Sequence, residues 1–409
     1  MTKKSAGIRI PTSLFFHIPV RTLNYCILLK TMNHLTWPCY VLTICVFTFM
    51  ISLVISIFYG LLLEDKMNTP IRTTMLLKQQ NKELVISAFR EIGQGTRNEI
   101  AQLTGLSIST CGNIIRELVE SGELSQGDMA PSQGGRPSKI YIYNANTSLA
   151  LAISLVANGE FNQIELATVN LQGTVLARES YMQPLHQLSF EFLDSLIAKQ
   201  FEETPKIKVI GMGIPGMVVH GEVLYCDMEE LEHLNLRDLL QTKYHVKVFI
   251  DNEMHFKTFG YFQAHSDIGL KDYALLNVPE HYTYGAGFMV NGHLIRGNAN
   301  FSGEINFLPY VSSRKELIEQ CAGDSTFVDL ISKVIITIIT ITDPRYIILC
   351  GFRFTSELVL EIQENVNKVL PPQLLPHFHL QQDISDEYLT GIISVITNLL
   401  TDKEPYSQS

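Results

Sequence analysis

The pattern of apolar and polar positions changes three times along the chain of 409 residues. Residues 37–63 carry no charge over 27 positions, long enough to cross a bilayer as a tilted helix. From about residue 75, apolar side chains recur at helical spacing. From residue 149 onward, apolar runs typical of buried strands alternate with helical patterns. The length and this alternation predict an α/β protein of more than one domain.

Two interpretations of residues 1–66 stay open. In one, a helix over residues 37–63 anchors the chain in the inner membrane, with everything after residue 66 in the cytoplasm. In the other, which we favour, Met67 is the true start, because ordinary soluble patterning begins there. Flanking charges do not orient the apolar run. We therefore expect a cytoplasmic protein, with a membrane partner only if residues 37–63 are expressed.

Residues 75–143 have the pattern of two short helices after a first amphipathic helix. Thr96 and Glu99 form a capping-box pattern, and Gly105 supplies the geometry at which that helix ends. Ser107 caps the next helix. The apolar positions expected to face inward are Leu76, Leu77, Leu84, Val85, Ala88, Phe89 and Ile92 in the first helix, Ile100 and Leu103 in the second, and Ile108, Cys111, Ile115, Leu118 and Val119 in the third.

The last of these helices leaves a polar face exposed, and a polar hairpin follows it. Small polar groups near the start of a second helix can approach base edges in the major groove, and an Arg one turn later can reach a phosphate or a guanine. The hairpin segment QGGRPSK can reach a narrow minor groove. The pattern over residues 67–143 predicts a winged helix-turn-helix that binds double-stranded DNA through Ser107, Ser109, Thr110, Asn113, Arg116, Arg136 and Lys139.

Residues 144–409 have the pattern of a large α/β domain. An Asn291-Gly292 pair predicts a hairpin turn. The apolar helix over 326–342 carries Lys333 and is too short to span a bilayer, so it is expected in a core. Strands are predicted at 149–156, 164–170, 174–178, 208–214 and 346–350 and around Leu275 and Phe288, with a helix near 190–201.

Charge is unevenly distributed along the chain, whose net charge is −10. Residues 1–66 carry +4, residues 67–143 carry +1, and the remainder carries −15. Because an acidic body repels phosphate, nucleic-acid contacts are expected in the near-neutral segment 67–143. The seven cysteines form no close pair, so neither a disulfide framework nor a zinc site is predicted.

The order of these segments resembles the ROK family (repressor, open reading frame, kinase), which includes xylose and N-acetylglucosamine repressors. The segments GGRPSKIYIYN, VIGMGIPGMVVHGEV, VFIDNEMHFKTFGYF, YGAGFMVNGHLIRGNANFSGEI and DPRYIILCG carry the resemblance, which runs from about Met67 to about Leu400. It implies that residues 144–409 have an actin-like, RNase H-like fold of the sugar-kinase type, with two lobes around a cleft.

Compared with the family's kinases, this sequence lacks several catalytic motifs. The first phosphate loop, Asp-x-Gly-x-Thr, corresponds to LALAISLVANGEF, which has no Asp. The second phosphate loop keeps only Gly285 and Gly287, beside the bulky His281, Tyr282 and Tyr284. The position of the catalytic Asp holds Glu253, which is one methylene longer. We therefore expect a non-catalytic domain without cofactor.

The resemblance implies three polar residues that can contact a bound sugar or sugar phosphate: Asn252, Glu253 and Glu304. The family's sugar-contact motif E-x-G-H reads Glu304-Ile305-Asn306-Phe307 here, and Cys321 stands alone where the family has a zinc-binding cluster, so no metal is expected. An alternative is that Asn252 and Glu304 only satisfy local backbone groups.

These features predict a DNA-binding transcription regulator, a repressor of carbohydrate-related genes, acting as a homodimer or homotetramer. A cleft ligand would change the spacing of its two recognition helices. The alternatives are a ROK-type sugar kinase, which would consume ATP, and a membrane-tethered regulator.

Overall fold

The computed structural model describes residues 76–130, 137–159, 161–184, 187–279 and 284–407. The chain divides into two compact units, Met1–Glu83 and Leu84–Ser409. The apolar run 37–63 and Met67 lie outside the described residues, so both interpretations of residues 1–66 stay open. The second unit contains residues 84–143 of the predicted DNA-binding segment and the whole of the large α/β part.

The first part of this unit is a small helical group with a three-stranded sheet. Residues 76–92 are helical. They are followed by β1 (Gln94–Thr96), α3 (Arg97–Thr104), α4 (Ile108–Glu120), β2 (Leu124–Met129) and β3 (Lys139–Tyr143). The strands pair antiparallel in the order β1-β3-β2. Their shared core contains Phe89, Ile100, Ile115, Leu118 and Leu124.

The buried face of the first helix differs from the predicted one. Val85, Ile86, Ala88 and Phe89 are buried, whereas the predicted core residues Leu76, Leu77, Leu84 and Ile92 are exposed. Leu103 in α3, also predicted to be buried, is 56% exposed. The first helix carries apolar residues on more of its surface than α3 and α4 can cover. Only the side with Val85 and Phe89 is buried.

The large part begins with a mixed sheet in the order β10-β7-β4-β5-β6. Its strands are β4 (Leu149–Asn158), β5 (Phe161–Asn170), β6 (Val175–Pro184), β7 (Ile207–Ile214) and β10 (Lys247–Asn252). β7 runs parallel to β4 and β10, while β5 is antiparallel to β4 and β6. Helices α5 (Phe190–Glu203) and α6 (Leu236–Tyr244) cover one face, and their apolar residues share its core. The predicted strands and the helix near 190–201 are observed, but the strand predicted at 174–178 continues to Pro184 because it pairs along β5 to its start at Phe161.

A second mixed sheet has the order β13-β12-β11-β14-β15. It consists of β11 (Tyr273–Asn277), β12 (Gly285–Val290), β13 (His293–Leu294), β14 (Tyr346–Cys350) and β15 (His377–Gln381). Asn291 and Gly292 both have positive φ in the turn between β12 and β13, as predicted. The helices α8 (Arg314–Ala322), α9 (Asp324–Thr342) and α10 (Ser356–Val369) cover one face.

The helix α9 is the one among the described residues whose length and composition would allow a membrane span. Half of its apolar window is buried inside the protein, and Phe327, Ile331, Val334 and Ile338 belong to the core under the second sheet. The prediction of a core helix is confirmed, but the expectation that it is too short to span a bilayer was wrong, because the helix already begins at Asp324.

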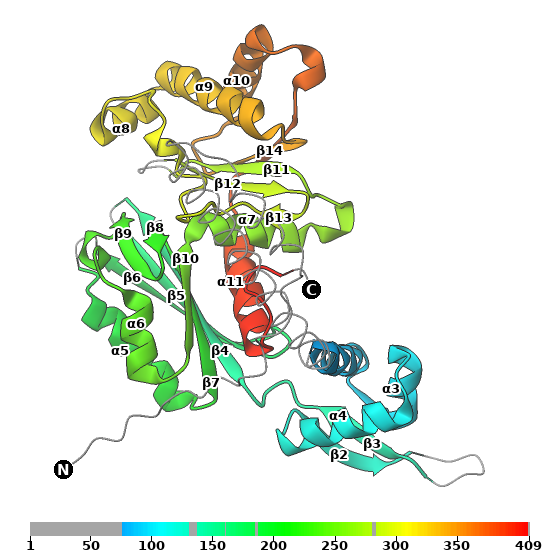
Figure 1. Ribbon diagram of the computed structural model, residues 1–409. Coiled ribbons are helices and arrows are strands. Elements are labelled where there is room, and N and C mark those ends of the chain that lie inside the picture. The colour runs from blue at the N-terminus through cyan, green and yellow to red at the C-terminus, as the bar shows by residue number, and fades with distance from the viewer. Residues whose placement is uncertain (1–75, 131–136, 160, 185–186, 280–283, 408–409) are drawn as a thin grey trace, which may run out of the picture. The chain divides into compact units, whose positions relative to one another are not determined.

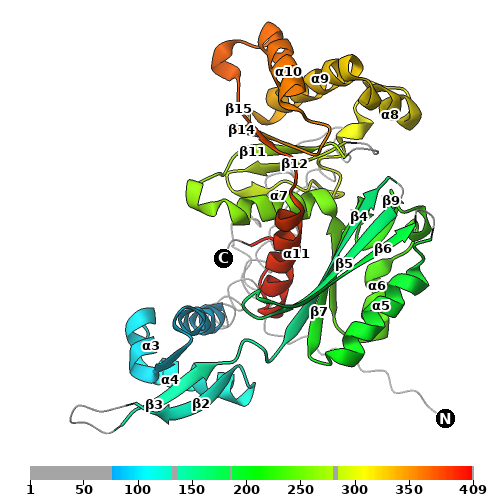
Figure 2. The ribbon, with the colours of Figure 1, turned by 180° about the vertical axis from the view of Figure 1, so that it is seen from behind.

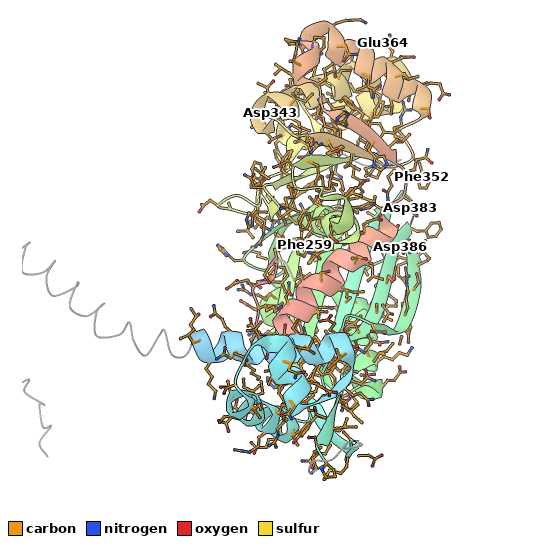
Figure 3. The ribbon with its side chains drawn as sticks, turned by 90° about the vertical axis from the view of Figure 1, so that its right-hand side faces the viewer. Phe259, Asp343, Phe352, Glu364, Asp383 and Asp386 are labelled. Carbon is orange, nitrogen blue, oxygen red and sulfur yellow. The ribbon has the colours of Figure 1, made fainter. Side chains whose placement is uncertain are left out.

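Two helices lie between the sheets, as Figures 1 and 2 show from opposite sides. They are α7 (Glu253–Ala264) and α11 (Ser385–Leu400). Phe259 of α7 is buried among them, whereas Asp343 and Glu364 lie on the outer side (Figure 3). Residues from both sheets, including Val209 and Leu275, share this central core. The layers therefore alternate between helices and sheets. The first sheet with α5 and α6 forms one lobe, the second sheet with α8, α9 and α10 forms the other, and α7 and α11 lie between the two lobes.

Candidate functional site

The two short helices begin at side-chain caps that fix where each starts. Thr96 Oγ1 accepts a hydrogen bond from Glu99 N (3.4 Å), and Thr96 N donates to Glu99 Oε2 (2.7 Å), which completes the predicted capping box. Gly105 ends α3 with φ 70°, in the left-handed region. Ser107 Oγ accepts from Thr110 N (3.1 Å) at the start of α4. The turn between α3 and α4 is therefore held at both ends.

The helix α4 has one buried and one exposed side. Cys111, Ile114, Ile115 and Leu118 are buried. Ile108 is 56% exposed, so the prediction that it faces inward was wrong: it lies in the first turn, beyond the reach of the core. The residues predicted to form the polar face are where the pattern put them, with Ser107, Ser109, Asn113 and Arg116 exposed and Thr110 half-buried.

Two arginines fasten the sheet to the helices beside α4. Arg97 Nη2 donates to Tyr141 Oη (2.8 Å), and Arg90 Nε donates to Tyr143 Oη (3.1 Å). Lys139 begins β3, is exposed, and donates to Gln126 on β2. Arg136 lies outside the described residues. The strand positions of the predicted hairpin are therefore observed, whereas its tip is not described.

A second candidate site lies between the lobes, where the three predicted ligand residues line one small cavity. Asn252 is the N-cap of α7, and its Oδ1 accepts from Met254 N (2.6 Å). Its Nδ2 donates to Glu304 Oε1 (2.6 Å). The cavity has a volume of about 40 Å³, which holds a few waters but no sugar ring. A sugar can enter only if the lobes move apart.

Glu253 is paired with a buried lysine. Its Oε2 accepts from Lys257 Nζ (2.9 Å), one turn later on α7, and the two side chains are 16% and 9% exposed. Lys257 Nζ also lies 5.3 Å from the centre of the Tyr388 ring on α11. A general base needs a free carboxylate oxygen within reach of the substrate hydroxyl. In this arrangement one oxygen of Glu253 is held by Lys257.

Sequence reasoning missed Asp227, which lines the same cavity. It follows the hairpin of β8 (Gly216–Val219) and β9 (Glu222–Cys226) and forms an ion pair with Arg314. Burial and the carboxylates of Glu253 and Glu304 raise the pKa of Asp227 to about 7. No motif contains this Asp, and only the fold brings it to the cavity.

Sequence reasoning also missed a hydrogen-bonded network around Asp251, which is fully buried at the end of β10. Its carboxylate accepts hydrogen bonds from His255 Nδ1 (2.9 Å) and Tyr406 Oη (2.6 Å) and forms an ion pair with Arg296 Nη2 (3.2 Å). Burial alone would raise the pKa of Asp251, but His255, Arg296 and Tyr406 outweigh it and lower this pKa to about 2. The network joins the first sheet to the loop after β13 and to the C-terminal segment.

The glycines of the motif around β12 are explained by close packing. A Cβ on Gly287 would lie 1.8 Å from Thr258 Oγ1, and one on Gly285 would lie 2.9 Å from Met254 Cγ, both on α7. His281 and Tyr282 lie outside the described residues. The two glycines therefore have a structural reason that needs no nucleotide.

Replacing Glu304 by Gln is expected to make stability less dependent on pH. Burial raises the pKa of Glu304, with Glu253 acting in the same direction. A raised folded pKa gives a contribution to stability that is full below the unfolded pKa of about 4.5 and is lost as the pH rises through the folded value. Gln keeps an acceptor for Asn252. Between pH 4.5 and pH 8, the melting temperature should therefore fall more in the parent chain than in Glu304→Gln.

The matched control for this measurement is Glu364→Gln, on the exposed side of α10. It should leave the pH dependence of the melting temperature unchanged. A steeper decline in Glu304→Gln than in the parent would contradict the raised pKa.

Residues 159–322 match the ROK family. The chain carries a ROK family domain. It is 28% identical over 282 residues to a xylose repressor of Caldicellulosiruptor bescii, covering 64% of this chain and 68% of that protein. It is 22% identical over 241 residues to the xylose repressor of Bacillus subtilis (57% and 61%), and 26% identical over 247 residues to the DNA-binding transcriptional dual regulator NagC of Escherichia coli (57% and 58%).

Solved structures of other proteins share the fold. A ROK family transcriptional regulator that is a homologue of the E. coli MLC protein has a TM-score of 0.58 at 18% identity, covering 80% of this chain and 97% of that one. Lmo2764, a candidate N-acetylmannosamine kinase from Listeria monocytogenes, has a TM-score of 0.52 at 13% identity, covering 62% and 100%. At these identities the likeness concerns the fold alone, and the fold is found in a regulator and in a candidate kinase.

Proposed function

We propose that this chain is a DNA-binding transcription regulator, a repressor of carbohydrate-related genes, in which residues 67–143 form a winged helix-turn-helix and residues 144–409 an effector domain. The observation that carries the proposal is the two-sided helix α4, with a buried apolar side and an exposed polar side after a capped turn. Relatives that carry the names of xylose repressors and NagC support it.

The polar side of α4 has the chemistry of a recognition helix. Asn113 can pair with an adenine edge, and Arg116 with a guanine or a phosphate. Ser109 and Thr110 stand in the first turn, where recognition helices contact bases. Ser107 uses its oxygen for the cap and stays exposed. Ile108 adds an exposed apolar group that suits the methyl of thymine.

The hairpin of β2 and β3 would act as the wing. Lys139 is exposed at the start of β3, and Arg136 precedes it in the chain by three residues. Both would add positive charge beside the groove that α4 occupies, which favours phosphate and narrow minor-groove contacts. The strongly acidic segment after residue 143 would be kept away from the DNA by repulsion.

A homodimer, or a homotetramer of two such dimers, would place two copies of α4 in successive major grooves of a pseudo-palindromic site. The experiment that tests this recovers genomic fragments bound by the purified full chain in the presence of excess unrelated duplex. We expect the recovered fragments to share an inverted repeat whose half-sites are about 10 base pairs, or a multiple of that, apart. Recovery of fragments without any shared sequence would contradict the proposal.

The cleft of the ROK domain would bind an effector without phosphoryl transfer. One of the two oxygens of Glu253 is bound by Lys257, the glycines at 285 and 287 serve packing against α7, and the first phosphate motif has no Asp. Asn252, Glu253 and Glu304 would contact a sugar or sugar phosphate once the lobes open. We propose that the domain needs no cofactor or metal and that the protein acts in the cytoplasm.

The kinase alternative has its own test. ATP consumption is measured with a panel of hexoses and amino sugars at millimolar concentration, for the full chain and for Glu253→Gln. We expect no sugar-dependent consumption in either protein. Consumption that Glu253→Gln abolishes would establish a sugar kinase and contradict the non-catalytic effector domain.

A further inference from the structure

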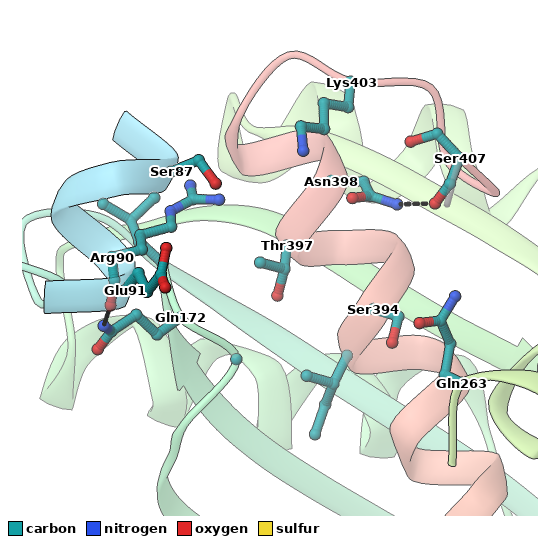
Figure 4. A pocket seen from close by; sticks show the side chains of 13 residues that line it. Ser87, Arg90, Glu91, Gln172, Gln263, Ser394, Thr397, Asn398, Lys403 and Ser407 are labelled. Carbon is teal, nitrogen blue, oxygen red and sulfur yellow. Dashed lines mark hydrogen bonds between the residues drawn. The ribbon is translucent and has the colours of Figure 1, made fainter. Parts of the chain in front are cut away.

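A larger cavity, of about 570 Å³, lies beside α11 (Figure 4). Its walls come from the helix of residues 84–92, the turn between β5 and β6, the end of α7, α11 and the C-terminal segment. It shares no lining residue with the cavity between the lobes. Its volume lies within the range of about 300–1,000 Å³ that is usual for small-molecule sites.

Two cations face this cavity from opposite walls. Arg90 projects from the first helix and Lys403 from the segment after α11 (Figure 4). Among the described residues, neither forms an ion pair with a carboxylate. Arg90 Nη2 is buried and has no hydrogen-bond partner. A buried charged donor without an acceptor is costly, so an anion placed here would supply what the protein lacks.

The wall formed by α11 carries neutral polar groups. Ser394 and Thr397 lie one turn apart on α11, and Gln263 of α7 points toward the same space (Figure 4). Thr397 Oγ1 is buried and has no hydrogen-bond partner. Asn398 is already engaged, because its Nδ2 donates to the carbonyls of Pro405 and Ser407 at 3.0 Å. Hydroxyl and amide groups of this kind recognise a polyol.

One carboxylate also borders the cavity, that of Glu91. This residue is exposed at the end of the first helix, so water screens its charge, while Arg90 and Lys403 are both at least partly buried. The sum of these groups favours a ligand with a negative end and a hydroxyl-rich body over a cation or an apolar compound.

We propose that this cavity binds a phosphorylated polyol, with the phosphate between Arg90 and Lys403 and the hydroxyls against Ser394, Thr397 and Gln263. Such a ligand would join the helix that leads into α3 to α11, which packs against β4 and β7. This binding site is independent of DNA binding, so it can be present whether or not the proposed function holds.

The test measures binding to the full chain by calorimetry without DNA. The probes are three phosphorylated sugars (glucose 6-phosphate, fructose 6-phosphate and ribose 5-phosphate), inorganic phosphate and glucose. We expect at least one phosphorylated sugar to bind more tightly than inorganic phosphate, and we expect Arg90→Gln to leave the response to unphosphorylated glucose unchanged. Arg90→Gln and Lys403→Gln should each weaken binding at least tenfold, whereas Lys315→Gln, an exposed lysine on α8, should leave it unchanged.

A further variant separates loss of binding from loss of folding. Thr397→Val removes a hydroxyl without a partner, so the melting temperature of the free protein should stay the same or rise, while ligand binding should weaken severalfold. The proposal is overturned if no phosphorylated sugar gives a saturable signal, if inorganic phosphate binds as tightly as all three, or if Lys403→Gln and Thr397→Val both bind like the parent.

Discussion

Replacing Gly260 by Ala is expected to destabilise the protein by about 3 kcal/mol or more, a large fraction of the stability of a typical domain. Gly260 lies where α7 crosses α11, and a Cβ there would stand 1.7 Å from the carbonyl oxygen of Glu387 and 2.7 Å from Gly391 N. Both are backbone atoms, so no side chain can move aside. The helices that join the two lobes would have to separate, which urea or thermal unfolding would show as a lowered midpoint.

The matched control is Gly112→Ala, another glycine inside a helix. A Cβ on Gly112 would meet the Arg97 side chain at 3.7 Å, which is ordinary contact. Since Gly costs about 0.5–1 kcal/mol relative to Ala within a helix, Gly112→Ala should raise the midpoint slightly. A small or stabilising effect of Gly260→Ala would contradict the close crossing of α7 and α11.

Replacing Asn113 and Arg116 together by Ala is expected to weaken binding to a recovered DNA site by about 2–4 kcal/mol, roughly 30- to 1,000-fold. Both side chains are exposed on α4 and contribute nothing to its buried side, so the fold should be unchanged. Fluorescence anisotropy with the labelled site measures the loss, and a thermal melt checks that the variant is folded.

The control for this pair is Arg237→Ala. The side chain of this Arg is 39% exposed on α6 and forms an ion pair with its neighbour Asp238, in the acidic part of the chain. It removes the same charge as Arg116→Ala, and DNA affinity should change less than twofold. Equal losses in both variants would mean that the effect is one of net charge and that α4 does not read the DNA.

Local signals in the sequence were sufficient to predict much of the fold. The capping box at Thr96, the left-handed Gly105 and the Asn291-Gly292 turn depend on residues close together in the chain, and all three are observed. Long apolar runs located β4, β7, β14 and α9, because a buried strand or helix leaves a continuous pattern. By contrast, Leu84, Ile92 and Ile108 are exposed because neighbouring elements do not reach them. The spacing of apolar residues along the chain does not show how far those elements extend.

The candidate sites were only partly predictable for the same reason. Asn252 and Glu304 were found through the family motifs, and the structure brings them into contact. Asp227 reaches the cavity that these two residues line only through the fold. Arg296 and Tyr406, from two other distant segments, meet at Asp251 for the same reason. The cavity between Arg90 and Lys403 could not be found from the sequence, because its walls are separated by some three hundred residues and neither cation lies in a motif.

The most direct test of the central claim, that the exposed side of α4 binds duplex DNA, is a titration of the full chain against a recovered site over a range of salt concentrations. We expect tight binding at 50 mM salt. The logarithm of the association constant should fall linearly with the logarithm of the salt concentration, because the protein contacts several phosphates. The absence of binding to any duplex at 50 mM salt would contradict this claim.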